Sequence, residues 1–298
     1  MTLQQNALVV GVDGGAAGIA AVRYAAVEAA RDGLDLVLVH VMPHTVAMSP
    51  MTPLITSGTF REVAERSLAT ARHVAEEAAG PEVRLHTDLR SGTRAHGLVE
   101  AGEGARAIVL GRRERPGLSG LVTGSVSTHV ATRAHCPVVS VPETWHHRTP
   151  VAPVVVGVDD PAHSFGLLEV AFDAAERRAA PLTVLHTWHL PGPYDDLVVE
   201  RVSGRAWHDQ GVEDIEKAIA SFRVDHPGVQ VEVDVRHQFP AAALMGAGEG
   251  AGLLLVGRRG RGAPFGFHLG GVARALLTRA HCPVEVVPLH PPRHEEAR

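Results

Sequence analysis

Two stretches of the chain carry almost the same text, and together they decide the fold. Residues 253–288 read LLLVGRRGRGAPFGFHLGGVARALLTRAHCPVEVVP, and residues 108–142 read IVLGRRERPGLSGLVTGSVSTHVATRAHCPVVSVP. Each opens with an apolar run typical of a buried strand, passes through a loop rich in glycine and arginine into a helical pattern, and ends in a second apolar run. The order strand, loop, helix, strand therefore occurs twice.

These two stretches belong to a repeat that runs along most of the chain. Its offset is 146 residues, as from Gly11-Val12-Asp13 to Gly157-Val158-Asp159 and from residues 101–105 to 247–251. A repeat of this length indicates a duplicated domain, because each copy is long enough to bury a core of its own.

The joint between the copies is polar and bounded by prolines, which is typical of a linker. We therefore expect one domain at residues 1–143, a linker at 144–151, a second domain at 152–289 and a disordered tail at 290–298.

Within each half, short apolar runs rich in β-branched residues alternate with helical patterns. In the first half we expect strands near residues 7–12, 35–41, 83–89, 106–111 and 138–141, and helices near 16–32, 60–79, 93–103 and 125–134. Strict alternation predicts an α/β fold with a parallel sheet and right-handed crossovers. The third run alternates between apolar and polar residues, which favours a place closer to the sheet edge.

Two helix starts carry capping signals. Thr59 followed by Glu62 predicts a capping box for the helix near 60–79. Ser164 is expected to cap the first helix of the second half.

The composition excludes several classes of function. With a net charge of −5 over 298 residues, the chain has neither a nucleic-acid footprint nor a polybasic membrane surface. The first residues lack the pattern of a signal peptide, and no apolar run reaches the ~18 residues of a membrane span. We expect a cytoplasmic protein. Lys217 is the only lysine, so the chain has no Walker A lysine.

Cysteine and histidine give no sign of a metal site. Only Cys136 and Cys282 occur, both within TRAHCPV, and the 19 histidines are scattered without a metal-ligand spacing. We interpret both cysteines as buried thiols; a redox link between them is disfavoured in a reducing compartment.

The strand ends give the best candidate for a binding site. In an open α/β sheet, ligands bind outside the carboxyl ends of the strands. There the first strand of each half runs into Asp13 or Asp159, and the fourth into a glycine-rich loop that leads to the last helix. The start of that helix offers free N–H groups and a partial positive charge, which suit phosphate.

These motifs resemble the universal stress protein family in its tandem form. The resemblance rests on Gly-x-x-Gly, nine residues and Gly-Ser/Thr, with an Asp after the first strand and Ala-x-Cys-Pro-Val before the last, and it covers both halves. It implies two Rossmann-like domains of the adenine nucleotide alpha hydrolase type, each a five-stranded parallel sheet of order 3-2-1-4-5 with helices on both faces. It also implies bound ATP, with Mg²⁺.

The resemblance implies which residues hold the nucleotide. The adenine side would be Asp13 with Val41 in the first half and Asp159 with Thr187 in the second. The phosphate side would be Gly111, Gly124, Ser125, Val126 and Ser127 in the first half, and Gly257, Gly260, Gly270 and Gly271 in the second.

Both copies depart from the family pattern. The first half has Glu114 in place of the second glycine, and the second half has Gly271 and Ala273 where hydroxyls belong. A missing hydrogen bond to a charged phosphate costs about 1.5–3 kcal/mol, and a carboxylate ~4 Å from phosphate costs about 1–4 kcal/mol. Because the Glu114 side chain can turn into water while a deleted hydroxyl cannot return, the first half is expected to be the better nucleotide site.

Each site residue also has a purely structural interpretation. Asp13 and Asp159 would cap the turn into the first helix, and Gly111 and Gly257 would only end a buried strand. Val41 and Thr187 would act through their backbone.

The arginine and aromatic side chains near the glycine loops also have structural interpretations. The arginine pairs 112–113 and 258–259 are phosphate clamps or, more commonly for arginines after a strand, a solvated rim. Phe265 and Phe267 are expected to pack under the loop rather than to stack on a base. His40 and His186 are expected to satisfy a hydrogen bond in the core, with a pH-sensing role as the alternative.

Three functions remain open at this point. The leading hypothesis is a stress-response regulator that binds ATP and is not chiefly a catalyst, since neither half pairs a nucleophile with a base. The second is a dimeric scaffold that has lost nucleotide binding in one or both halves. The third, an ATP pyrophosphatase, would need an SGGxDS-like loop that neither GVDGGA nor GVDDPA provides.

The last strands predict how the chain assembles. Residues 138–141 and 284–287 would be exposed apolar sheet edges, which must be covered. The resemblance implies that these strands pair with each other about a pseudo-twofold axis. We further expect two chains to associate into a homodimer.

Overall fold

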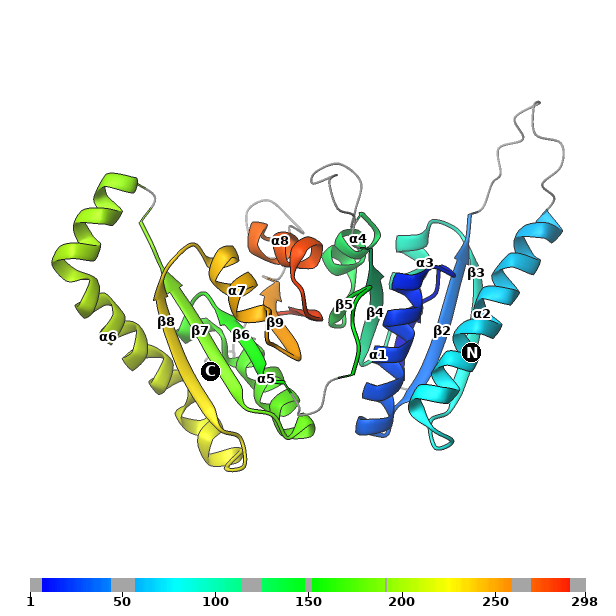
Figure 1. Ribbon diagram of the computed structural model, residues 1–298, viewed down its shortest axis with the longest axis horizontal. Helices are drawn as coiled ribbons and strands as arrows, with labels where there is room; N and C mark the ends of the chain where they lie inside the picture. Colours follow the sequence, from blue (N-terminus) through cyan, green and yellow to red (C-terminus); the bar gives the residue numbers. More distant parts are fainter. Residues whose placement is uncertain are drawn as a thin grey trace, which may run out of the picture. The chain divides into compact units, whose positions relative to one another are not determined.

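The computed structural model forms two compact units, residues 1–147 and 148–298, which are described one at a time (Figure 1). The residues that the structure describes are 7–43, 57–113, 125–147, 152–190, 192–258 and 269–289.

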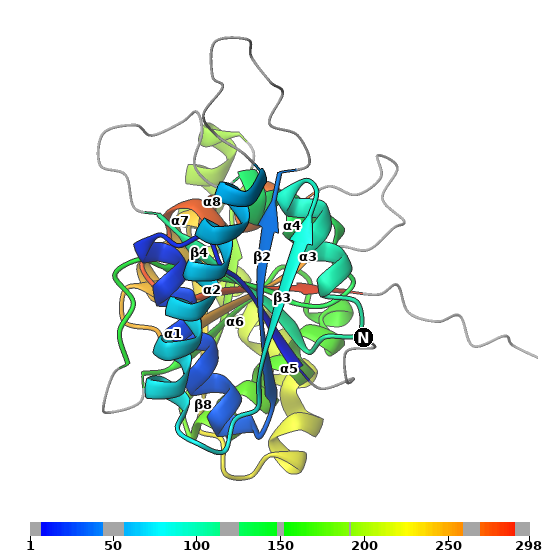
Figure 2. The same cartoon turned by 90° about the vertical axis from the view of Figure 1, so that its right-hand side faces the viewer.

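Unit 1 is a parallel sheet between two pairs of helices. Its elements are β1 (Ala7–Gly11), α1 (Ala16–Asp32), β2 (Asp35–Met42), α2 (Ser57–Ala79), β3 (Leu85–Ser91), α3 (Arg94–Ala101), β4 (Ala107–Arg112), α4 (Ser125–Arg133) and β5 (Val138–Pro142). All strand pairs are parallel, in the order β3-β2-β1-β4-β5. Figure 2 shows α1 and α2 on one side of this sheet and α3 and α4 on the other.

Unit 2 repeats this arrangement. Its elements are β6 (Val154–Val158), the 3₁₀ turn η1 (Pro161–His163), α5 (Phe165–Arg178), β7 (Leu182–Trp188), α6 (Pro193–Asp225), β8 (Val231–His237), α7 (Pro240–Gly248), β9 (Leu253–Arg258), α8 (Gly271–Arg279) and β10 (Val284–Pro288). The parallel order is β8-β7-β6-β9-β10. Both units thus have the predicted α/β fold with the order 3-2-1-4-5.

The central strands explain why the chain folds this way. Val9, Val10 and Ile108 have no exposed side-chain surface, because β1 and β4 are covered by helices on both faces. Burying each such side chain stabilises the fold by about 1.5–3 kcal/mol. In unit 2, Phe172 of α5 fills the matching core and stacks on Phe222 of α6.

The edge strand β3 behaves as its sequence predicts. Its residues are partly buried or exposed, with none fully buried, whereas the inner strand β2 is almost wholly buried. The alternation at residues 83–89 therefore did indicate a strand at the edge of the sheet. The predicted pairing of the last strands of the two halves concerns the relation between the units, and it stays a prediction.

Both predicted capping motifs are wrong in detail. Helix α2 begins at Ser57, so Thr59 and Glu62 lie inside it; its polar first turn hid the true start from a pattern based on apolar periodicity. Ser164 does precede α5, but its Oγ donates to the Asp160 carbonyl at 2.6 Å and caps no helix N–H. The reason is η1, whose turn brings the carbonyl four residues back within reach of the hydroxyl.

Candidate functional site

The candidate site of each unit lies where the first and fourth strands end side by side. In unit 1, β1 pairs with β4 from Leu8 opposite Ala107 to Val10 opposite Val109. In unit 2, β6 pairs with β9 in the same way. The chain leaves these neighbouring strands toward opposite sides of the sheet, which makes their carboxyl ends the switch point where open α/β sheets bind ligands.

Asp13 spans this switch point in unit 1. Its Oδ1 accepts a hydrogen bond from the Gly15 N–H at 2.9 Å, and its Oδ2 lies 2.7 Å from Nη2 of Arg113, the residue that follows β4. Gly14 takes a φ of 74°, which lets the chain turn tightly between Asp13 and Gly15. Asp13 thus caps the turn, as the structural interpretation held, and also links the ends of β1 and β4.

The Asp13–Arg113 ion pair is open to solvent. The two side chains are 41% and 52% exposed, and an exposed pair of this kind is worth about 0–1 kcal/mol. An incoming anion can therefore replace the carboxylate at Arg113 at little cost.

Gly111 has a structural reason to be glycine. A Cβ there would come within 2.1 Å of the Ala17 carbonyl oxygen in the first turn of α1. The end of β4 therefore packs directly on the helix backbone. At the repeat-related Gly257, a Cβ would instead meet the Leu289 side chain, 2.5 Å from its Cδ1.

The corresponding turn of unit 2 is built differently. Asp160, and not the strand-end residue Asp159, accepts a hydrogen bond from the Ala162 N–H at 3.1 Å. Its second oxygen lies 2.8 Å from Nδ1 of His163, and this hydrogen bond is the main reason why the pKa of Asp160 is lowered. Asp159 is exposed.

The starts of the last helices lie at the same end of each sheet. Gly270 and Gly271 at the start of α8 are exposed, no side chain caps this helix, and a Cβ on either glycine would meet nothing within 4 Å. In unit 1, Val126 is partly buried and Ser127 only 6% exposed. Gly124, Glu114 and Gly260 lie outside the described residues, as do Phe265, Phe267 and the side chain of Ser125.

Val41 and Thr187 occupy the ends of β2 and β7. The Val41 side chain is buried, with its methyl groups 3.0 Å from where a Cβ on Gly97 of α3 would lie. Only its backbone can therefore face a ligand. Thr187 is half-buried, in register with Arg236 of β8.

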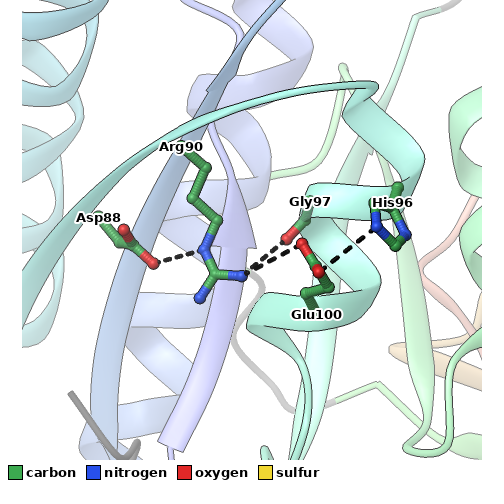
Figure 3. A network of polar contacts seen from close by, with 5 residues as sticks. All are labelled: Asp88, Arg90, His96, Gly97 and Glu100. Carbon is green, nitrogen blue, oxygen red and sulfur yellow. Dashed lines mark hydrogen bonds and ion pairs between the residues drawn. The ribbon is translucent and has the colours of Figure 1, made fainter. Parts of the chain in front are cut away.

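Beside Val41, a network of charges ties the edge strand to α3 (Figure 3). Arg90, the register partner of Val41, donates to Asp88 at 2.7 Å and to the Gly97 carbonyl at 3.4 Å. Glu100 lies 4.0 Å from Arg90 and 3.4 Å from His96. The network holds the helix on which Val41 packs.

The interpretation of both arginine pairs as a solvated rim is wrong for Arg112 and Arg258. Their exposed fractions are 5% and 9%, because each is the last residue of a buried strand. Arg113 is the exposed member of its pair.

The expected core hydrogen bond is confirmed for His186, and His40 has the Val12 carbonyl as its neighbour at the same place in unit 1. His186 Nδ1 lies 2.9 Å from the Val158 carbonyl oxygen. His40 Nδ1 is buried. Burial is the main cause that lowers the pKa of His40, and the nearby Val12 carbonyl opposes it.

Comparison with known proteins gives the family of the chain. The model of the universal stress protein family matches residues 6–142 and 151–288. The chain belongs to the universal stress protein family. It is 31% identical to a universal stress protein of Mycobacterium tuberculosis over 96% of each chain, and 33% identical to one of Mycobacterium bovis over 95% of this chain and 97% of the relative.

A solved universal stress protein shares the architecture. The crystal structure of such a protein from Archaeoglobus fulgidus aligns with a TM-score of 0.68, covering 97% of this chain and all of the other. At 20% identity this likeness shows the fold alone. Family membership supports a role in the stress response.

Sequence reasoning missed one cluster in this universal stress protein. Trp188 and His237 end β7 and β8 in register with each other, and Trp207 of α6 packs on Trp188 with ring centroids 5.4 Å apart. No spacing pattern links three residues so far apart in sequence. The register of β7 and β8 brings Trp188 and His237 together, and the packing of α6 adds Trp207.

Neither a metal cluster nor a membrane span is found in the part of the chain that the structure describes. No three His, Cys, Asp or Glu side chains there gather closely enough to hold a metal ion. No helix there is long and apolar enough to cross a bilayer.

Proposed function

We propose that this universal stress protein binds ATP, or another adenine nucleotide, at the carboxyl end of the unit 1 sheet and acts as a nucleotide-dependent regulator of the stress response. The observation that carries the proposal is the contact between Asp13 and Arg113, at 2.7 Å, across the ends of β1 and β4. A guanidinium therefore lies at the switch point where β1 and β4 end.

The charges at this edge fit a polyphosphate. Arg113 can leave Asp13 for a phosphate oxygen, since Arg–phosphate hydrogen bonds are charge-assisted and can be bidentate. The first N–H groups of α4 add a partial positive charge. The Val41 backbone faces the same edge and supplies donors and acceptors for the adenine.

The magnesium ion that accompanies ATP would be held mainly by the nucleotide. Among the described residues, no carboxylate cluster offers a dedicated site, and Asp13 already serves Gly15 and Arg113. Mg²⁺ commonly keeps several waters and binds through substrate phosphates. Asp13, once released by Arg113, is the carboxylate available to a water of that ion.

The second candidate function is a scaffold without nucleotide. Gly111 and Asp13 each have a full structural explanation, in the packing on Ala17 and in the cap on Gly15. Ser127, expected to contact phosphate, is buried. These three observations support the scaffold, because each residue has a structural role without nucleotide.

Isothermal titration of nucleotide-free protein with Mg-ATP separates the two candidates. We expect saturable binding, weakened about tenfold or more in Arg113→Met, because a hydrogen bond to a charged group is worth about 1.5–3 kcal/mol. Arg72→Met is the matched control, since Arg72 pairs with Glu76 on the exposed face of α2. Absence of binding at millimolar Mg-ATP would contradict the nucleotide-dependent regulator and favour the scaffold.

The two halves can be told apart by their helix starts. Ser125→Ala is expected to weaken ATP binding more than removal of any hydroxyl in the second half. Glu114→Gly is expected to strengthen it, because it removes a carboxylate beside the phosphates. Unchanged affinity in Glu114→Gly would mean that the carboxylate points away from the nucleotide.

The proposed assembly is a cytoplasmic homodimer in which the last strands of each chain pair with each other. The support is the apolar character of β5 and β10, whose exposed edges would otherwise invite aggregation. Light scattering on the purified chain tests the dimer. A monomer at all concentrations would contradict it.

A further inference from the structure

The aromatic cluster of unit 2 lies under the beginning of α6. His237 stacks on Trp188 with ring centroids 4.2 Å apart and an interplanar angle of 28°. Gly204 and Trp207 of α6 lie against the other parts of the Trp188 ring. Figure 1 shows α6 running alongside β8, with its first turns near the end of that strand. The first turns of α6 therefore cover Trp188.

Two carboxylates on these turns hold His237. Its Nε2 lies 2.8 Å from Oδ1 of Asp196, and its Nδ1 lies 3.4 Å from Oε1 of Glu200. Asp196 Oδ1 also accepts a hydrogen bond from the Leu190 N–H at 2.7 Å. Both ring nitrogens of His237 thus face acceptors, an arrangement that only the protonated imidazole satisfies fully, because it alone has two N–H donors.

The two ends of α6 are anchored differently. Ile215 and Ile219 in its second half are fully buried in the core. In its first half, Tyr194 and Val202 are 77% and 79% exposed. The second half is therefore held by packing, whereas the first depends on Trp188 and on the charges around His237.

Unsatisfied polar atoms oppose the position in which the first turns of α6 cover Trp188. Trp188 Nε1 is buried without a hydrogen-bond partner, and so is Nδ1 of the neighbouring His189. A buried donor without a partner is costly, and water would satisfy it if the first turns of α6 moved away. The position of these turns is thus a balance between an ion-pair network and an unsatisfied donor.

We propose that residues 193–207 form an acid-closed lid over Trp188, held shut by protonated His237 and released when His237 is neutral. The lid would give this universal stress protein a direct response to acidification, independent of nucleotide binding.

The direction of the response follows from the groups that face His237. These are Asp196 and Glu200 from α6. His189, which follows β7, acts on Asp196. The hydrogen bond that His237 donates to Asp196 is the largest cause that raises the pKa of His237 above 6.5. A raised pKa in the closed state means that the network contributes fully below 6.5 and is lost as the pH rises through the higher value.

The pH range in which the lid is closed also has a lower limit. The hydrogen bond with His237 is the main cause that lowers the pKa of Asp196 below 3.8. The contribution of Asp196 to the closed state is therefore present above pH 3.8 and is lost only when the pH falls through its lowered pKa. The lid is closed between these two limits and open above the upper one.

The device belongs to the second half alone. At the repeat-related positions of unit 1, the offset of 146 residues places Met42 and Ser91 instead of Trp188 and His237. Neither can stack or titrate in this way, which makes unit 1 an internal reference for any measurement.

Hydrogen exchange of the full-length protein at pH 6 and pH 8.5, corrected for intrinsic rates, tests the lid. We expect residues 193–207 to exchange several-fold faster at pH 8.5, with residues 208–225 unchanged. In His237→Gln the fast exchange should appear at both pH values. The control His226→Gln, which removes a histidine paired with Glu176 at the other end of α6, should retain the difference.

Two outcomes would overturn the proposal. One is equal protection of residues 193–207 at both pH values in the unaltered protein. The other is a pH difference that survives in His237→Gln. If that variant does not fold, Asp196→Asn serves instead, because it removes the charge of the main partner and leaves the Trp188–His237 stack; it should likewise abolish the difference.

Discussion

The chain turns from the first strand into the first helix in two different ways. In unit 1, GVDGGA passes through Gly14 with a positive φ and enters α1 at Ala16. In unit 2, GVDDPA passes through Asp160 and η1, and α5 begins only at Phe165. Three identical residues are thus followed by two unlike turns at the edge where a ligand would bind.

This difference teaches that the duplication preserved the sheets more strictly than the sites. The strand order and the buried central strands recur in both units. At the carboxyl ends, however, unit 1 places the Asp13–Arg113 pair, whereas unit 2 places the Asp160–His163 pair and the lid of α6. The two halves are therefore expected to have different functions.

The largest expected difference between the halves concerns their repeat-related glycines. Gly111→Ala should destabilise unit 1 by about 2–3 kcal/mol, at the upper end of overpacking costs, because the new methyl group meets backbone of α1 that cannot move alone. Gly257→Ala should cost under about 1 kcal/mol, because the Leu289 side chain can change rotamer. Urea unfolding of both variants measures the difference.

The comparison is informative because the two substitutions are chemically identical. Equal losses in the two variants would show that β4 and β9 end in equivalent packing, against the contacts described above. A larger loss in Gly257→Ala would mean that Leu289 is held rigidly.

Much of the fold follows from sequence because it depends on patterns that are local. The apolar runs at residues 35–41 and 138–141 predict β2 and β5 to within a residue. The start of α2 does not follow in this way, since its first turn is polar and carries no apolar period. The burial of Arg112 could not be predicted either, because charge alone suggests exposure.

The candidate site follows from sequence only in part. The motif placed Asp13 and Gly111 at one edge, and the pairing of β1 with β4 brings them there. The partner of Asp13 is Arg113, a hundred residues away, and only the sheet order makes them neighbours. The lid needs the register of Trp188 opposite His237, which no local pattern encodes.

A smaller difference is expected between the two capping aspartates. Asp13→Ala should destabilise unit 1 by about 1–2 kcal/mol, because it removes the cap on Gly15 together with the Arg113 pair. The loss should be the same from pH 6 to pH 8, since arginine stays charged. Thermal unfolding across this range measures it.

Asp160→Ala is the matched variant in unit 2, and the stability that it removes should depend on pH in the acid range. The hydrogen bond from His163 lowers the pKa of Asp160 below 3.8, so its contribution is present above 3.8 and fades as the pH falls through the lowered value. Asp160→Ala and the unaltered protein should then converge in stability. Convergence at neutral pH would show that Asp160 contributes nothing to the turn.

The smallest expected difference concerns the arginines of the two edge strands. Arg90 joins Asp88 to the Gly97 carbonyl on α3, whereas Arg236 donates hydrogen bonds to Asp234 within β8. Each exposed or half-exposed pair is worth about 0.2–1 kcal/mol. Arg90→Met should therefore speed hydrogen exchange in α3 a few-fold, because it frees that helix from the sheet edge, and Arg236→Met should leave α7 unchanged. Equal effects on both helices would mean that the network beside Val41 does not position α3, and the proposed adenine side of unit 1 would lose its rigid support.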